Sequence, residues 1–186
     1  MTRKPRTDAE QNRQHIVAVA RAAFVADGLE LPMREIARRA RLGVATVYRH
    51  FPSRTELIDA VLADEVAGCE VEMRAALDDL DPWRALSGVI QRFADRQVRH
   101  RGLNEAILGA HAAGAAFAEQ RRAHARGLEQ LVERARRAGA VRPGLSVVDV
   151  RVGLMAIASF RTLPAERADL AVQKLTNLLI AGMSGQ

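Results

Sequence analysis

The sequence predicts an all-α protein, and three observations lead to that expectation. Strong helix formers, namely Ala, Leu, Arg, Glu and Lys, make up half of the 186 residues. Aromatic residues number only seven, which argues against a β-sandwich or barrel. All six prolines fall where a helix is expected to begin or a loop to run. A chain of this length holds one fair-sized domain, or a small domain joined to a larger one.

The first 50 residues are expected to form a longer helix followed by two short ones. Thr7 and Glu10 form a capping box that begins the first helix, and Gly28 ends it. Pro32 then opens a short helix, and its apolar residues recur at helical spacing. The two short helices are expected over 33–40 and 44–50, with a turn at 41–43 between them.

Six further helices are expected behind these three, which gives about nine in all. Their starts are marked by a second capping box at Ser53 and Glu56, by Asp81 before Pro82, and by Ser146. They are expected over 53–77, 83–99, 103–111, 117–138, 146–160 and 165–182. The predicted architecture is a small three-helix domain over 1–52 and a larger helical bundle over 53–186.

The charge of the chain is uneven. Residues 1–60 hold 11 Lys and Arg against 7 Asp and Glu, so they carry +4 of the net +6. A positive end of this kind indicates a polyanion-binding surface, although an Arg-rich composition bias would produce the same surplus. The single Cys69 cannot form an internal disulfide, and the chain shows neither a secretory signal nor an apolar stretch long enough to span a bilayer. We therefore expect a cytoplasmic protein with no membrane partner.

Two short helices joined by a three-residue turn, after a longer helix, are typical of a helix-turn-helix DNA-binding domain. Small and apolar residues at Ile36, Ala37 and Ala40 are expected to form the inner face of the first short helix. The inner face of the second is expected to consist of Val44, Val47 and Phe51. Its outward positions are Ala45, Thr46, Tyr48, Arg49 and His50. Their hydroxyl, guanidinium and imidazole groups can donate to phosphates or touch base edges.

These residues closely resemble the tetracycline-repressor (TetR) family. The likeness runs from Ala18 to Leu62 and is most specific in Thr46-Val-Tyr-Arg-His-Phe51 and the following Pro-Ser-Arg-Thr-Glu-Leu57. It implies a homodimeric transcriptional regulator that places two recognition helices in successive major grooves of a palindromic double-stranded operator. The DNA contacts that the resemblance implies are Arg3, Lys4, Arg6, Arg34, Gly43, Val44, Ala45, Thr46, Tyr48, Arg49, His50, Ser53 and Arg54.

Their roles differ along the motif. Gly43 to Thr46 are expected near bases, Tyr48 and His50 at phosphates, and Arg49 at either. Ser53 and Arg54 begin the fourth helix, whose free N–H groups favour another phosphate. Arg3, Lys4 and Arg6 are expected in a disordered arm, and Arg38 and Arg39 are expected to face solvent.

The chain departs from the family pattern at two positions. Arg41 stands where the family usually has Gly in the turn, and Ala45 stands where Gly or Pro is common. A left-handed backbone at Arg41 costs about 1 kcal/mol.

A regulator of this kind is expected to bind an effector in its C-terminal bundle. The residues expected to line the pocket are Met73, Trp83, Phe93, His100, Glu105, His111, Phe117, Met155 and Phe160, with Asn104 and Cys69 nearby. An ordinary helical core would contain the same large apolar residues, so both interpretations stay open. The Ala- and Gly-rich segment 109–118 leaves room for a ligand that shifts the fourth helix and so changes the spacing of the two DNA-binding domains.

The last two helices have apolar faces too broad for a single neighbour. Paired with their symmetry mates, they are expected to form a four-helix dimer interface. The interface residues predicted are Val147, Val150, Leu154, Ile157, Leu170, Leu175, Leu178 and Leu179.

The sequence therefore predicts a sequence-specific transcriptional regulator, with repression favoured over activation because binding over a promoter blocks polymerase without further contacts. The predicted effector is a small, largely apolar ligand that releases the operator. Control by a protein partner, or activation, remains an alternative. Enzyme activity is not expected, since the histidines lack metal-ligand spacing and the chain has no phosphate-binding loop or nucleophile elbow. No metal or cofactor is expected.

Overall fold

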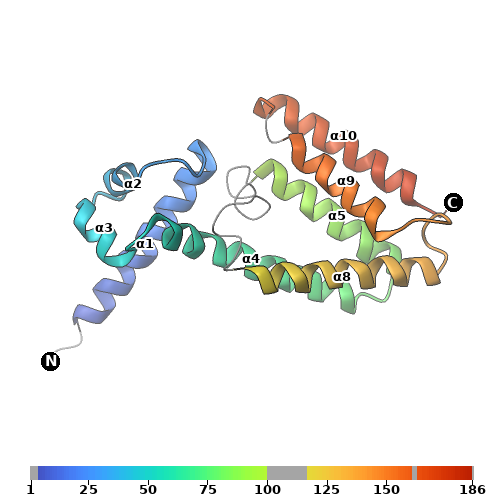
Figure 1. Cartoon of the computed structure of the whole chain (residues 1–186), viewed down its shortest axis with the longest axis horizontal. Coiled ribbons are helices and arrows are strands. Elements are labelled where there is room, and N and C mark those ends of the chain that lie inside the picture. Colours follow the sequence, from blue (N-terminus) through green and yellow to red (C-terminus); the bar gives the residue numbers. More distant parts are fainter. Residues whose placement is uncertain (1–3, 100–116, 161–162, 186) are drawn as a thin grey trace. The chain divides into compact units, whose positions relative to one another are not determined.

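The computed structural model describes residues 4–99, 117–160 and 163–185. Those residues form eight helices, which confirms the all-α prediction (Figure 1). Their bounds are α1 (Lys4–Asp27), α2 (Met33–Ala40), α3 (Val44–His50), α4 (Arg54–Asp78), α5 (Pro82–Arg99), α8 (Ala118–Arg137), α9 (Val147–Ser159) and α10 (Ala165–Met183). The helix expected over 103–111 lies outside the described residues.

Side-chain caps begin several helices where the sequence predicts them. Ser53 Oγ accepts from the Glu56 N–H at 3.1 Å, and Asp81 Oδ1 accepts from the N–H of Trp83 at 3.0 Å. The capping box at the start of α9 is complete, with the Asp149 carboxylate accepting from the Ser146 N–H at 2.8 Å. These caps satisfy N–H groups that have no partner inside the helix.

The start of α1 differs from the prediction. The helix begins at Lys4, so Thr7 lies inside it and does not cap it. Pro5 is compatible with this earlier start, because N–H groups in the first turn have no partner within the helix. The N–H that proline lacks is therefore not missed there.

The chain divides into two compact units. Among the described residues, the first contains 4–66 and Phe117, and the second contains 67–99, 118–160 and 163–185. The division falls inside α4, after Val66, further along than the predicted boundary after residue 52.

In the first unit, α2 packs against both α1 and α3. Its core is closed by fully buried residues from each element, among them Ile16, Phe24, Ile36, Val47, Phe51, Leu57 and Leu62. The His15 Nε2–H donates to the Ala40 carbonyl at 3.0 Å, which ties α1 to the end of α2. The two short helices thus have fixed positions on a longer one.

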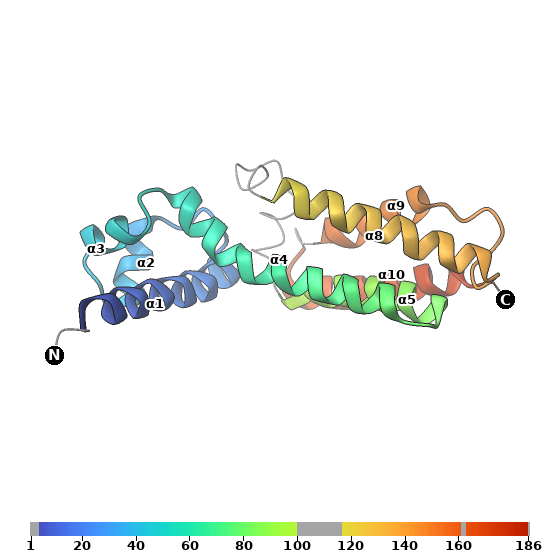
Figure 2. The same ribbon diagram turned by 90° about the horizontal axis from the view of Figure 1, so that it is seen from below.

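In the second unit, α5 packs against α8, α9 and α10 (Figure 2). Two glycines permit close helix contacts: a Cβ at Gly127 would lie 2.7 Å from Met73, and one at Gly153 would lie 2.9 Å from Leu179. Within the described ranges, no helix combines the length and apolar character that crossing a bilayer requires.

Candidate DNA-binding site

The recognition helix α3 exposes one face and buries the other. Val47 and Phe51 are fully buried in the first unit's core, as predicted. Tyr48 is 47% exposed, and Gly43, Ala45 and Arg49 are also exposed, while Thr46 and His50 are half-buried. Val44 was expected on the inner face, but it is 42% exposed, because it is the first residue of α3 and has no preceding helical turn beside it. It therefore belongs to the outward surface.

The turn between α2 and α3 contains the left-handed residue that the sequence suggested. Arg41 has φ 55° and ψ 38°, and its side chain is exposed. The N–H of Leu42 donates to the Ala37 carbonyl at 3.0 Å, which closes the end of α2. The turn therefore forms its hydrogen bond although an arginine, and not a glycine, occupies the left-handed position.

Two of the arginines on α2 are held by carboxylates. Both Arg38 and Arg39 donate to Glu35, at 2.7–2.9 Å, and Arg39 also donates to Asp27 at 2.6 Å. Hydrogen bonds from Arg38 and then Arg39 lower the pKa of Glu35 to about 2. Arg38 and Arg39 are exposed, as expected for solvent-facing residues, and Arg34 is exposed on the same helix.

The junction between α3 and α4 holds the remaining predicted contacts. The Ser53 hydroxyl is occupied as a helix cap, and Arg54 donates to Glu30 at 3.3 Å. The His50 Nε2, the Arg54 Nε and the Arg54 Nη2 are buried and form no hydrogen bond within the described chain. Any phosphate contact from these two side chains must therefore use their other nitrogens or follow a side-chain rotation.

The basic residues at the N-terminus differ from the prediction. Lys4 and Arg6 lie on the first turn of α1 and not in a disordered arm, and Arg3 lies outside the described residues.

One basic residue beside the recognition helix was not predicted. The Arg13 guanidinium carbon lies 4.9 Å from the centroid of the Phe51 ring. The sequence signal was the position of Arg13 one turn before Val17, on the helix that supports α3, but only the fold brings it to Phe51.

The predicted effector residues that the structure describes have different surroundings. Trp83, Phe93 and Phe160 are half-buried against the second unit's core, and Met73 is buried in it. Phe117 packs against the first unit's core, and Met155 is 71% exposed on α9. Cys69 is half-buried on α4, and His100, Asn104, Glu105 and His111 lie outside the described residues.

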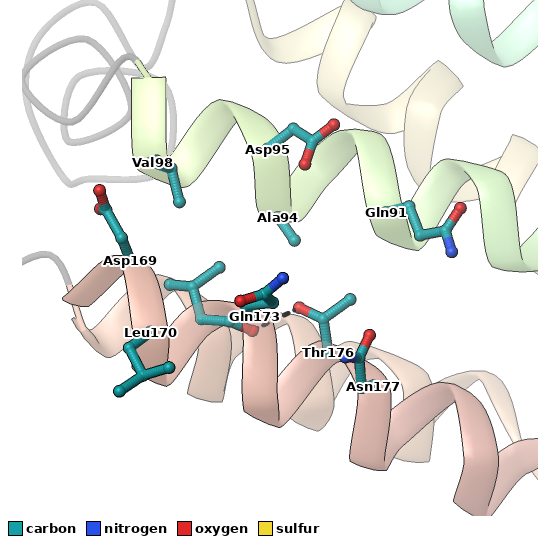
Figure 3. Close-up of a pocket in the computed structure, with 10 residues that line it drawn as sticks. Gln91, Ala94, Asp95, Val98, Asp169, Leu170, Gln173, Thr176 and Asn177 are labelled. Carbon is teal, nitrogen blue, oxygen red and sulfur yellow. Dashed lines mark hydrogen bonds between the residues drawn. The ribbon is translucent and has the colours of Figure 1, made fainter. Parts of the chain in front are cut away.

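A groove of about 640 Å³ lies elsewhere, between α5 and α10 (Figure 3). Its floor is apolar at Ala94 and Val172, and Thr176 Oγ1 donates to the Val172 carbonyl at 2.7 Å. The other residues that line it are Gln91, Asp95, Val98, Asp169, Leu170, Gln173 and Asn177. No local sequence motif marks this groove, because its residues become neighbours only when α5 and α10 pack.

The second unit also contains buried polar atoms on α5 and α8. Gln97 is 3% exposed, and its Oε1 accepts no hydrogen bond within the described chain; the same holds for the buried Oε1 of Gln120. His124 lies one turn after Gln120, where burial and the charge of Arg96 lower its pKa, against an opposing effect of Glu72.

The predicted interface residues fall into two groups. Val150 and Ile157 are buried in the core of the chain itself, and Val147, Leu154, Leu175 and Leu179 pack against that core. Leu170 and Leu178 are exposed, at 54% and 70%. The exposed apolar side chains of α9 are instead Val148, Val152 and Met155, spaced four and three residues apart along one face.

The geometry of α1 to α3 defines the class of protein. A buried inner face and an exposed helix with Tyr48 and Arg49, set on a supporting helix, form a helix-turn-helix DNA-binding domain. Among the described side chains, no three His, Cys, Asp or Glu residues are placed to hold a metal ion.

Comparisons with known proteins agree with this class. Residues 16–61 match the family model "Bacterial regulatory proteins, tetR family", and residues 81–185 match "Transcriptional regulator SbtR-like, C-terminal domain". The transcriptional regulator SrpR of Pseudomonas putida is 34% identical over 87 residues, which are 46% of this chain and 41% of SrpR. The chain thus spans less than half the length of that relative.

Solved structures match along nearly the whole chain. A TetR transcription regulatory protein from Mycobacterium vanbaalenii is 30% identical with a TM-score of 0.63, over 96% of this chain and 98% of the other. The ketosteroid transcriptional regulator KstR2 of Mycobacterium tuberculosis shares the fold, with a TM-score of 0.72 at 19% identity over 92% and 94% of the two chains. The chain belongs to the TetR family of transcriptional regulators and has an SbtR-like C-terminal domain. This family consists of DNA-binding regulators and not of enzymes, as the sequence predicted.

Proposed function

We propose that this protein is a homodimeric repressor that reads a palindromic operator through α2 and α3 and releases it on binding a small organic ligand. The exposed face of α3 carries the proposal, because it presents Tyr48 and Arg49 outward while Val47 and Phe51 anchor it. Family membership supports DNA operators and small-molecule effectors in general. The dimer, the direction of regulation and the type of ligand are specific to the proposal.

Base reading is assigned to the start of α3 and phosphate binding to its end. The N-terminal residues of a recognition helix reach base edges, and contacts to the backbone fix its register. Thr46 lies on the first turn of α3, with its hydroxyl near Gly43, and Tyr48 lies two residues further along and is exposed.

This division of roles predicts different effects of Thr46→Ala and Tyr48→Phe. Losing the Tyr48 hydroxyl should weaken binding to all duplexes by a similar factor, because phosphates carry no sequence information. Thr46→Ala should relax the choice of base at one position of each half-site, where a good contact discriminates by about 1–3 kcal/mol. Affinities for an operator and its single-base variants measure both effects. If the two substitutions changed the base preferences in the same way, the division of roles would be wrong.

The dimer is supported by the apolar surface of the last two helices. Val148, Val152 and Met155 lie exposed along α9, and Leu170 and Leu178 lie exposed on α10. Side chains of this kind in a row are typical of a contact with another helix. We assign the dimer interface to these five residues in place of the buried Val150 and Ile157.

The effector proposal is supported by the groove between α5 and α10. The groove's volume falls in the range of about 300–1,000 Å³ that small-molecule sites occupy.

Transcription in vitro from a promoter that overlaps the operator distinguishes repression from activation. A decrease in transcript with added protein supports repression, and an increase would contradict it.

A further inference from the structure

Arg13 is an exposed arginine of α1 that the proposed function does not use. Its guanidinium lies over the ring of Phe51, 4.9 Å from the centroid, and Phe51 directly follows the recognition helix. Both ribbon views show the N-terminal half of α1 alongside α3 (Figures 1 and 2). The stack therefore holds a positive charge at the C-terminal end of α3.

The geometry of this contact leaves the donors of Arg13 available. A cation–π contact uses the flat face of the guanidinium, while its five N–H groups point outward in the plane. Within the described chain, Arg13 takes part in no ion pair or hydrogen bond, whereas Arg38, Arg39 and Arg54 each pair with a carboxylate. Arg13 is thus a pre-oriented guanidinium whose planar fork matches a phosphate.

We propose that Arg13 binds a phosphate of the DNA backbone and acts as a positioning residue at the edge of the recognition site. This inference rests on the proposed DNA binding of the first unit. A phosphate is favoured over a base because Phe51 marks the C-terminal end of α3, and base reading belongs to its N-terminal end. Ser53 and Arg54, the neighbouring candidates for phosphate binding, lie two and three residues after Phe51.

The test uses Arg13→Gln and a mixed-sequence duplex, so no operator is needed. The logarithm of the affinity decreases with the logarithm of the salt concentration, and each lost phosphate contact makes this slope less steep by about 0.9. The magnitude of the slope should therefore decrease by that amount for each protomer. The affinity should fall about tenfold at low salt on any sequence, as expected for a charge-assisted contact. Arg13→Lys keeps the charge and should keep the slope close to that of the wild-type protein.

Arg74→Gln is the matched control, since Arg74 is an exposed arginine of α4 in the second unit. It removes the same charge and should leave the slope unchanged. A wild-type slope for Arg13→Gln would overturn the inference, even if affinity fell, because the loss would then reflect repacking at Phe51. If the wild-type protein itself bound no duplex, the proposed DNA binding would fail instead, so the two failures are distinguishable.

Discussion

Arg41 is the one non-glycine residue with positive φ in the part of the chain that the structure describes. The end of α8 has the same hydrogen-bonded motif, but there Gly139 occupies the left-handed position with φ 65°. In both, an N–H bonds five residues back, from Leu42 to Ala37 at 3.0 Å and from Ala140 to Ala135 at 2.9 Å. The two helix ends therefore differ in the residue that adopts the strained conformation.

Arg41→Gly should stabilise the protein. Removing the left-handed strain gains about 1–2 kcal/mol, and the greater freedom of glycine in the unfolded chain cancels part of it, so we expect a net gain of about 0.5–1 kcal/mol. Denaturant unfolding measures the change. Gly139→Ala is the reverse control, because a Cβ there meets nothing within 4 Å, and it should destabilise through backbone conformation alone. A less stable Arg41→Gly would show that the Arg41 side chain makes a stabilising contact.

His124 should make stability depend on pH. Burial first, and then Arg96, lower its pKa below 6.5, so the unfolded state takes up a proton at higher pH than the folded state. The free energy of unfolding should therefore fall as pH drops below about 6.5, and the fall should stop below the folded pKa. Glu35 and Asp79, each with a pKa lowered to about 2 chiefly by arginine hydrogen bonds, affect a lower range of pH.

The check is a series of unfolding curves between about pH 7 and pH 5, the interval in which histidine titrates. His124→Gln should flatten the dependence in this interval. An equally steep dependence in the variant would assign the effect to another group.

At the scale of elements, helix α9 is apolar on two faces. Val150 and Ile157 are buried in the chain's own core, while Val148, Val152 and Met155 are exposed on the other side. The sequence predicted the helix and its cap, but periodicity cannot tell which of two apolar faces meets the chain's own core. This is why Met155 was expected in a pocket and Val150 in an interface.

Val152→Arg should separate the proposed dimer. Its side chain is 59% exposed at the middle of the α9 stripe, so an arginine there would place two like charges across the symmetry axis without disturbing the fold. We expect a monomer by analytical ultracentrifugation, an unchanged helical circular-dichroism spectrum, and at least tenfold weaker operator binding, which is about 1.4 kcal/mol. Leu80→Arg is the control, because Leu80 is 94% exposed outside any helix. A Val152→Arg protein that stayed dimeric would move the interface elsewhere.

The sequence predicted helices and their caps more completely than it predicted sites. Ser53, Asp81 and Ser146 act through neighbours two or three residues away, so local sequence is sufficient to identify them. The groove between α5 and α10 and the stack of Arg13 on Phe51 join residues far apart in the chain. Predicting such contacts requires the packing of whole helices, which periodicity alone does not supply.

At the scale of the whole molecule, the helix-turn-helix lies in the first unit, and the proposed ligand-binding and dimerisation surfaces lie in the second. Helix α4 contributes residues to both units, from Arg54 to Asp78. A ligand can release DNA only if it binds one arrangement of the two units more tightly than the other. For the proposed symmetric dimer, we expect a palindromic operator with half-sites about 34–36 Å apart, or a multiple of that distance.

Selection of bound duplexes from a random DNA pool tests whether the protein recognises a palindromic operator. The salt concentration should be near 150 mM, because purely electrostatic binding is then weak, with a dissociation constant of about 10⁻⁴–10⁻⁶ M. We predict that an inverted repeat is enriched and that Thr46→Ala relaxes one position in each half. Salt-sensitive binding without any enriched sequence would contradict the account, because the exposed face of α3 would then bind DNA through charge alone.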